Sequence, residues 1–202
     1  MITVAGIGPG NPKLVTGVIA LITLICLEKT ETVKAFGRVS RSLGNLRKDY
    51  IEIKSVSEVL DILDRKENVL ILASGDPCFY GILEYLKKKC IEVDNVLPGI
   101  SSFQYMMGKL KKSWQYANFL SLHGRDEGLD NVKNNPLTII LTDKNNTPSK
   151  ISKALNSLGV KGKIYAGFNL SYDDEKIVLA DIGDDIEDIS PLAVVVIENE
   201  MD

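Results

Sequence analysis

The sequence predicts an α/β protein built from two consecutive α/β domains, and three observations lead to this prediction. Short apolar runs alternate with segments of helical periodicity along the chain. Several of the runs end in loops rich in glycine and proline. The pattern breaks into basic and aromatic residues at "KLKKSWQYAN", residues 109–118, and then begins again. We therefore expect a first domain over residues 1–112 and a second over residues 113–202.

The first domain is expected to hold a parallel sheet. A run such as "VLILA" (69–73) has no polar residue on either face, which is typical of a strand that helices cover on both sides. The segment "LVTGVIALITLICL" (14–27) is too short to span a membrane, so we interpret it as a buried or subunit-facing helix. The expected strands are 2–5, 32–36, 69–73 and 93–97, and the expected helices are 14–27, 57–65, 80–89 and 101–110.

In the second domain, apolar and helical segments resume with "FLSLHGR", "LTIILTD", "KISKALNSLG", "KIYAGF" and "PLAVVVIE". The acidic runs "YDDEK" and "GDDIEDIS" are interpreted as solvated loops.

Composition excludes several classes of protein. With 202 residues and 45% hydrophobic residues, the chain is long and apolar enough to form hydrophobic cores. Its net charge of -3 argues against nucleic acid as the main partner. Cys26, Cys78 and Cys90 form no CxxC pair, so neither a disulfide framework nor a zinc site is expected. We expect no metal site, no membrane segment and a reducing, cytoplasmic location.

The loop "GIGPGNP", Gly6 to Pro12, follows the first strand but departs from phosphate-binding patterns. The dinucleotide pattern requires a third glycine where Asn11 stands, and an acidic residue where the second strand ends in Phe36-Gly37-Arg38. A GxxxxGK[ST] pattern is absent as well. Pro9 and Pro12 instead fix φ and remove two donors, so the loop suits a ligand with few or no phosphates.

Ligands of α/β sheets bind beyond the carboxyl ends of the strands, and four loops stand there. They are "GIGPGNP" (6–12), "SGDPCFYG" (74–81), "PGISSF" (98–103) and "LTDKNNTP" (141–148). In this order and spacing, together with "SLHGR", they resemble the tetrapyrrole methylase family of class III S-adenosylmethionine-dependent methyltransferases over essentially the whole chain. "SLHGR" and "NLSYDDEKI" favour the subgroup that methylates carbon 5 of a corrin precursor in cobalamin (vitamin B12) biosynthesis.

The resemblance implies an N-terminal parallel sheet, a C-terminal mixed sheet and S-adenosylmethionine folded in the cleft between the domains, with S-adenosylhomocysteine as the product. The implied cofactor-binding residues are Pro9, Ser74, Gly75, Asp76, Phe79, Ser101, Ser102, Thr142, Phe168 and Asn169. Phe168 stands where the subgroup commonly has a glutamate. The sulfonium donor is already activated, so the reaction needs alignment with an electron-rich ring carbon and no protein nucleophile.

The implied corrinoid substrate carries many carboxylates, so cations are expected beside it. Arg125 is the first candidate because its guanidinium can bind a carboxylate bidentately, and His123 beside it is interpreted as an orienting or substrate-binding residue. Lys144 and Arg38 are further candidates, although Arg38 and Arg41 also fit a solvated helix start. Cys78 is expected to have a packing role.

The family also implies partners. A homodimer is expected, and because the chain ends at "VVVIENEMD", the step that methylates C15 and removes a carboxylate is expected from a separate protein. Three alternatives stay open: a methylase of another corrin carbon, a diphthine synthase, and a non-catalytic nucleotide-binding module.

Overall fold

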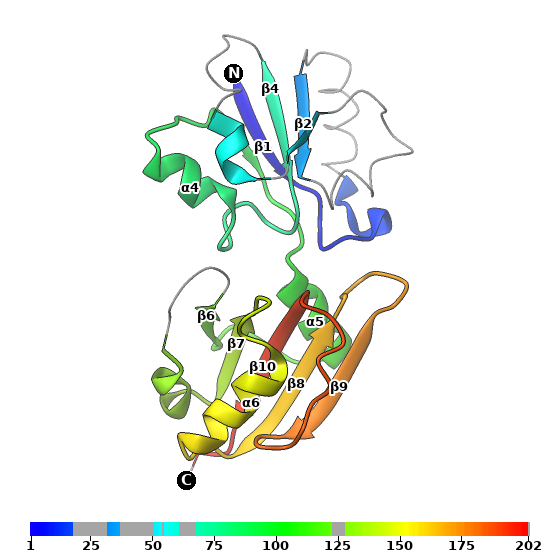
Figure 1. Ribbon diagram of the computed structural model, residues 1–202. Helices are drawn as coiled ribbons and strands as arrows, with labels where there is room; N and C mark the ends of the chain where they lie inside the picture. Colours follow the sequence, from blue (N-terminus) through cyan, green and yellow to red (C-terminus); the bar gives the residue numbers. More distant parts are fainter. Residues whose placement is uncertain (18–31, 37–50, 54, 61–67, 123–127, 202) are drawn as a thin grey trace. The chain divides into compact units, whose positions relative to one another are not determined.

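The computed structural model describes residues 1–17, 32–36, 51–53, 55–60, 68–122 and 128–201. The chain forms two compact units, Met1–Ser102 and Phe103–Asp202, each holding one five-stranded sheet (Figure 1). The division falls at the start of helix α5 (Ser102–Leu110). The expected boundary followed residue 112, beyond the end of that helix.

The first sheet has the strand order β3-β2-β4-β1-β5, and every neighbouring pair is parallel. The prediction of a parallel N-terminal sheet is confirmed. Its strands are β1 (Ile2–Gly6), β2 (Thr32–Phe36), β3 (Ile51–Ile53), β4 (Val69–Ala73) and β5 (Asn95–Leu97).

Strand β4 explains why the first sheet holds together. All five of its residues are buried, and they alternate between two apolar clusters. Leu70 and Leu72 join one cluster, whereas Ile71 joins the other, against which helix α4 (Ile82–Lys88) packs Ile82 and Leu86. A strand buried on both faces is what its continuous apolar run predicted. Most of the expected helix over 14–27 and most of the one over 57–65 lie outside the described residues.

The second sheet is mixed, as predicted. Its order is β6-β7-β10-β8-β9, in which β6 and β7 are parallel and the other neighbouring pairs are antiparallel. Its strands are β6 (Asn118–Ser121), β7 (Leu137–Leu141), β8 (Gly162–Phe168), β9 (Lys176–Asp181) and β10 (Ala193–Asn199).

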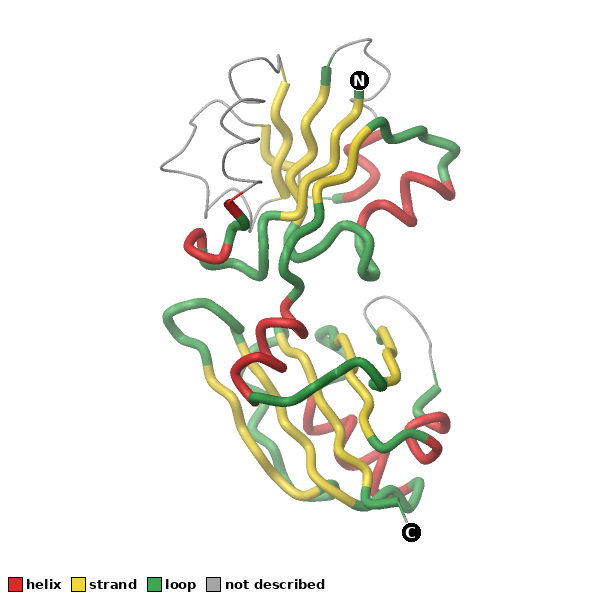
Figure 2. The backbone as a smooth tube through the Cα atoms, turned by 180° about the vertical axis from the view of Figure 1, so that it is seen from behind, coloured by secondary structure: helices red, strands yellow, loops and turns green. Residues whose placement is uncertain are grey.

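Two helices cover opposite faces of the second sheet, as the front and rear views show (Figures 1 and 2). Helix α6 (Pro148–Ser157) buries Ile151 and Leu155 in a core that includes Val195 and Ile197 of β10. Helix α5 buries Phe103, Met106 and Met107. The sequence begins α6 with Thr147, whose hydroxyl accepts the Lys150 N–H at 3.4 Å, followed by a proline at the first helical position.

Candidate functional site

Three loops of the first unit lie at one edge of its sheet. Strands β4, β1 and β5 are parallel neighbours, so their carboxyl ends lie side by side and lead into residues 6–12, 74–81 and 98–103. Because ligands of parallel sheets bind at this edge, the loops chosen from the sequence stand where a site is expected.

Three glycines let these loops approach closely, and we call Gly6, Gly75 and Gly99 the glycine junction. A Cβ atom added to Gly6 would overlap the carbonyl oxygen of Gly75 and lie 2.8 Å from the backbone nitrogen of Gly99. A Cβ atom added to Gly99 would overlap the same carbonyl oxygen and lie 2.5 Å from that of Gly6. No side chain fits at these two positions without a shift of backbone.

Hydrogen bonds join the first two loops. The N–H of Gly75 donates to the carbonyl of Gly8 at 2.7 Å, and the N–H of Ile7 donates to that of Ala73 at 2.9 Å. Gly8 and Gly75 have φ values of 86° and 68°, in the left-handed region that favours glycine. Pro9, which follows Gly8 in the chain, is buried. The loop after β1 is therefore held against the loop after β4.

Asp76 is half-buried and shapes its own loop. Its carboxylate accepts the N–H of Cys78 at 2.8 Å, and its carbonyl accepts the N–H of Phe79 at 3.2 Å. Ser74 is exposed beside it. Cys78 is exposed, so the predicted packing role is wrong. Partial desolvation of its thiol, followed by the charge of Asp76, raises the pKa of Cys78 and keeps it a weak nucleophile.

The loop after β5 contributes Ser101 and Ser102 at the start of helix α5. Ser101 is buried and Ser102 is half-buried. A Cβ atom on Gly75 would lie 3.6 Å from the Cα atom of Ser101, so the two loops are in van der Waals reach. The structure thus brings together the predicted cofactor residues of the first unit.

The predicted residues of the second unit gather where β10 begins. Strand β10 runs antiparallel to both β7 and β8, so its first residues lie beside the carboxyl ends of those strands. The hydroxyl of Thr142 donates to the carbonyl of Ala193 at 2.7 Å, and the N–H of Asn169 donates to that of Leu192 at 3.0 Å. Phe168 is fully buried in the core of this unit, which leaves its backbone as the part that can meet a ligand.

Asn169 begins the turn that follows β8. Its φ of 46° lies in the left-handed region, which asparagine tolerates better than most residues. Its side-chain amide donates to a carboxylate oxygen of Asp174 at 2.7 Å and accepts the hydroxyl of Ser190 at 2.6 Å. Its carbonyl accepts the N–H of Tyr172 at 3.0 Å.

Glu175 ties the same turn to helix α5. Its carboxylate accepts the N–H of Ser171 at 2.6 Å and pairs with Lys109 at 3.0 Å. Burial alone would raise the pKa of Glu175, but the hydrogen bonds from Ser171, Lys109 and Tyr105 outweigh it and lower that pKa. The same pairing raises the pKa of Lys109.

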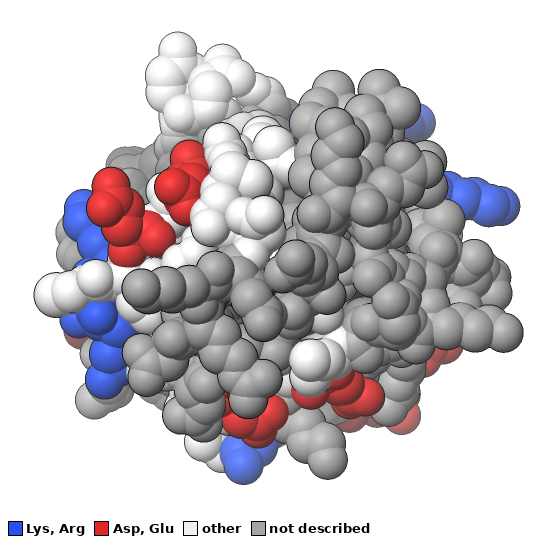
Figure 3. Space-filling view, turned by 90° about the horizontal axis from the view of Figure 1, so that it is seen from above, with Lys and Arg blue, Asp and Glu red and all other residues white. Residues whose placement is uncertain are grey.

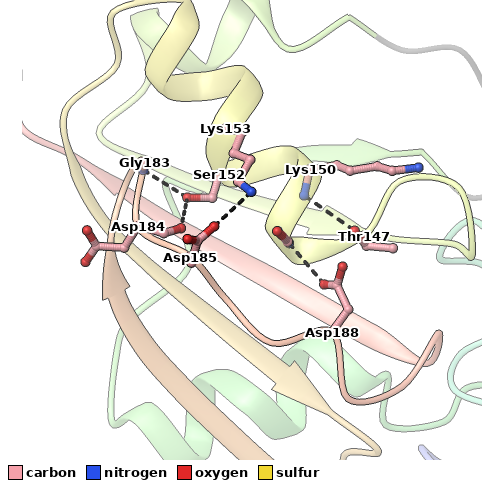
Figure 4. Close-up of polar contacts among 9 residues, drawn as sticks. Thr147, Lys150, Ser152, Lys153, Gly183, Asp184, Asp185 and Asp188 are labelled. Carbon is pink, nitrogen blue, oxygen red and sulfur yellow. Dashed lines mark hydrogen bonds and ion pairs between the residues drawn. The ribbon is translucent and has the colours of Figure 1, made fainter.

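The two acidic runs are not simply solvated, so that expectation is wrong in part. In "YDDEK", Asp174 and Glu175 make the inward contacts described above. In "GDDIEDIS", Ile186 is buried in the core, and Asp188 accepts the N–H of Ser149 at the start of α6 at 3.1 Å (Figure 4). Charge patterning alone could not reveal this, because Asp174 and Glu175 bind groups of the turn just before them, and Asp188 meets the start of α6 only in the folded chain.

The predicted cationic residues are placed only in part. Lys144 is exposed in the turn after Thr142. Arg38, Arg41, His123 and Arg125 lie outside the described residues. In the view of Figure 3, described side chains of both charges are visible at the surface.

The described residues hold neither a metal centre nor a membrane-spanning helix. Among them, no group of three or more His, Cys, Asp and Glu side chains could hold a metal ion. Within the same residues, no helix has both the length and the apolar character needed to cross a membrane.

Comparisons with known proteins define the class. Residues 1–184 match the Tetrapyrrole (Corrin/Porphyrin) Methylases, and the chain belongs to this family. The probable cobalt-precorrin-7 C(5)-methyltransferase of Methanocaldococcus jannaschii is 31% identical over 215 residues, which cover 99% of each protein. The cobalt-precorrin-7 C(5)-methyltransferase of Salmonella typhimurium is 28% identical over 185 residues, covering 88% of this chain and 89% of that one. The predicted family and methyltransferase class are confirmed.

Solved structures agree on the fold. The precorrin-6Y methylase (cbiE) of Archaeoglobus fulgidus has a TM-score of 0.76 at 20% identity, covering 100% of this chain and 99% of that one. The uroporphyrin-III C-methyl transferase of Thermus thermophilus, solved with S-adenyl homocysteine, has a TM-score of 0.75 at 21% identity and covers 97% of this chain and 96% of that one. The predicted α/β methylase fold is confirmed.

Proposed function

We propose that this chain is an S-adenosylmethionine-dependent methyltransferase of cobalamin biosynthesis that methylates C5 of cobalt-precorrin-7. One observation carries the proposal: similarity to the archaeal relative of that name extends over 99% of both chains. Similarity confined to one unit would support no more than a shared cofactor fold. Here it covers both units, including the strand ends that bear the candidate site.

The charge of the first unit's loops suits the proposed cofactor. Residues 6–12, 74–81 and 98–103 contain a single charged side chain, Asp76. S-Adenosylmethionine carries a methyl group on a positively charged sulfur, which makes that methyl group open to attack by an electron-rich carbon. A loop set with one carboxylate and no cation favours such a ligand over a phosphate-bearing one.

We infer that this chain's own residues would bind the cofactor and the substrate and orient them for methyl transfer. We propose that the loops of the first unit contact the methionine and ribose portions of the cofactor, and that the strand ends of the second unit contact the adenine. The first group is Pro9, Ser74, Gly75, Asp76, Phe79, Ser101 and Ser102, and the second is Thr142, Phe168 and Asn169. Holding donor and acceptor in line can contribute roughly 7 to 11 kcal/mol, so no protein nucleophile is required.

The substrate would be held through its carboxylates. Lys144 is exposed two residues after Thr142 and offers one cation. Arg125, His123 and Arg38 are proposed as further substrate-binding residues on the strength of their loops in the sequence. Replacing Arg125 with alanine is expected to raise the KM for the corrinoid while leaving cofactor affinity unchanged, which steady-state kinetics and titration would separate.

We also propose a cytoplasmic homodimer that works with a separate C15-methylating, decarboxylating protein. The arrangement is implied by the family resemblance. Light scattering of the purified protein tests the dimer, and co-purification from cells that make both proteins tests the partner. A monomer at working concentration, or failure to co-purify, would contradict the respective part.

Titration with S-adenosylhomocysteine tests the cofactor site. We expect micromolar binding by the wild type and a loss of roughly 10- to 100-fold in Asp76→Ala, because a hydrogen bond to a charged group contributes about 1.5 to 3 kcal/mol. Glu92→Ala is the control, since it removes the same charge from an exposed position of the same unit. Absence of binding by the wild type would contradict the proposal.

A further inference from the structure

Ser190 closes a ring of hydrogen bonds at the carboxyl end of β8. Its hydroxyl donates to the side-chain carbonyl of Asn169 at 2.6 Å and accepts the N–H of Leu192 at 3.1 Å. The N–H of Asn169 donates to the carbonyl of Leu192 at 3.0 Å, which completes the ring. One half-buried hydroxyl therefore joins the end of β8 to the start of β10.

The ring supports the turn that follows β8. Asn169 and Ser171 both have positive φ values, 46° and 71°, and such residues usually need surrounding contacts to stay in place. The side-chain NH₂ group of Asn169 donates to a carboxylate oxygen of Asp174 at 2.7 Å. Without Ser190, the side-chain carbonyl of Asn169 and the N–H of Leu192 both lose the partner described above.

The same ring fixes the neighbouring strand end. Thr142, which follows β7, donates to the carbonyl of Ala193, the residue after Leu192. The carbonyl groups of residues 192 and 193 thus accept hydrogen bonds from the residue after β8 and from the residue after β7, respectively. A shift of this segment would move both strand ends that we assign to the adenine.

We propose that Ser190 is a positioning residue for the cofactor: it preorganises the β8 and β7 strand ends without touching the ligand. This inference rests on the proposed function, because the ligand is S-adenosylmethionine. When a turn is ordered before binding, the ligand does not have to order it, so the entropic cost of binding is lower. Removal of the ring should therefore weaken cofactor affinity.

A comparison of three variants by titration with S-adenosylhomocysteine, well below the unfolding temperature of each, tests the proposal. Ser190→Ala should bind about tenfold more weakly, which is the affinity equivalent of one net hydrogen bond. Ser190→Thr keeps a hydroxyl and should restore affinity to within about twofold of the wild type.

Ser152→Ala is the matched control. Ser152 is fully buried in helix α6, accepts the N–H of Gly183 at 2.9 Å and donates to the carbonyl of Asp184 at 3.4 Å (Figure 4). It therefore holds the far part of the same β9–β10 connection and should lower the unfolding temperature while leaving affinity unchanged. Unchanged affinity in Ser190→Ala would overturn the proposal, and so would equal weakening in Ser190→Ala and Ser152→Ala. Failure of the wild type to bind would instead overturn the proposed function itself.

Discussion

At the glycine junction, the absence of side chains is what lets three loops share one edge of the first sheet. The sequence placed each of these loops after a strand, and the parallel neighbours β4, β1 and β5 bring them together. It did not indicate that Gly6 and Gly99 pack against the same carbonyl, because that contact joins residues far apart in the chain. Local patterns identify a loop, whereas its partners depend on the sheet order.

Replacing Gly99 with alanine tests the close approach. We expect the free energy of unfolding to fall by about 1 to 3 kcal/mol, because the new Cβ atom overlaps backbone that cannot move alone. Binding of S-adenosylhomocysteine should weaken in parallel. Chemical denaturation and titration measure the two effects.

Gly108→Ala is the contrasting variant. Gly108 lies within helix α5, and nothing stands within 4 Å of an added Cβ atom. Alanine should therefore raise stability by roughly 0.5 to 1 kcal/mol through its better helix propensity. Equal destabilisation by both substitutions would contradict the packing account.

At the same scale, the sequence did not indicate which polar side chains of the β8–β9 turn and of the β9–β10 connection make structural contacts. Asp174 and Glu175 stood in a run interpreted as solvated, and Ser190 carried no signal at all. The acidic run itself was the available sign, since carboxylates near a strand end often accept backbone N–H groups. Phe168 was expected at the cofactor, but its ring lies in the core.

At the scale of elements, helix α6 depends on its first turn. The Thr147 hydroxyl satisfies one backbone N–H that the helix leaves unpaired. Thr147→Ala should lower the free energy of unfolding by about 1 kcal/mol. Thr147→Ser should lower it by much less, because serine keeps the capping hydroxyl. Denaturant titration of both variants checks this, and equal losses would contradict a capping role.

The link between helix α5 and the β8–β9 turn should make stability depend on pH. The pKa of Glu175 is lower in the folded chain than its ordinary value of 4.5, so its contribution is complete above that value and is lost as the pH falls through the folded pKa. Glu175→Gln should be less stable than the wild type near neutral pH, and the difference should shrink in acid.

Measuring the free energy of unfolding at several pH values checks this prediction. Glu84→Gln serves as the control, because Glu84 and Lys88 form an exposed ion pair on helix α4, and such pairs contribute little. A difference between Glu175→Gln and the wild type that stays constant down to strongly acidic pH would contradict the assignment.

Elements buried on both faces were the ones the sequence revealed. Strand β4 was predicted with its observed bounds because its apolar run is continuous. Strand β9 was not singled out, because it lies at the edge of its sheet and contains exposed residues such as Leu179. Strand β3 is only three residues long and two of the three are exposed, so periodicity could not identify it.

For the whole molecule, the sequence predicted two α/β domains with a parallel and a mixed sheet, and both sheets are present. The loop motifs in their order and spacing sufficed for the resemblance to the family, because each motif is a local segment. The roles of Arg125, His123 and Arg38 stay predictions, because they depend on a substrate and on residues that the structure does not describe.

Locating the transferred methyl group tests the central claim most directly. The purified protein would be incubated with cobalt-precorrin-7 and S-adenosylmethionine labelled with ¹³C in its methyl group, and the product examined by NMR. The account predicts a single new labelled methyl group at C5, formed by the wild type and strongly reduced in Asp76→Ala. A label at another ring carbon, or no transfer from a cofactor that binds, would contradict it.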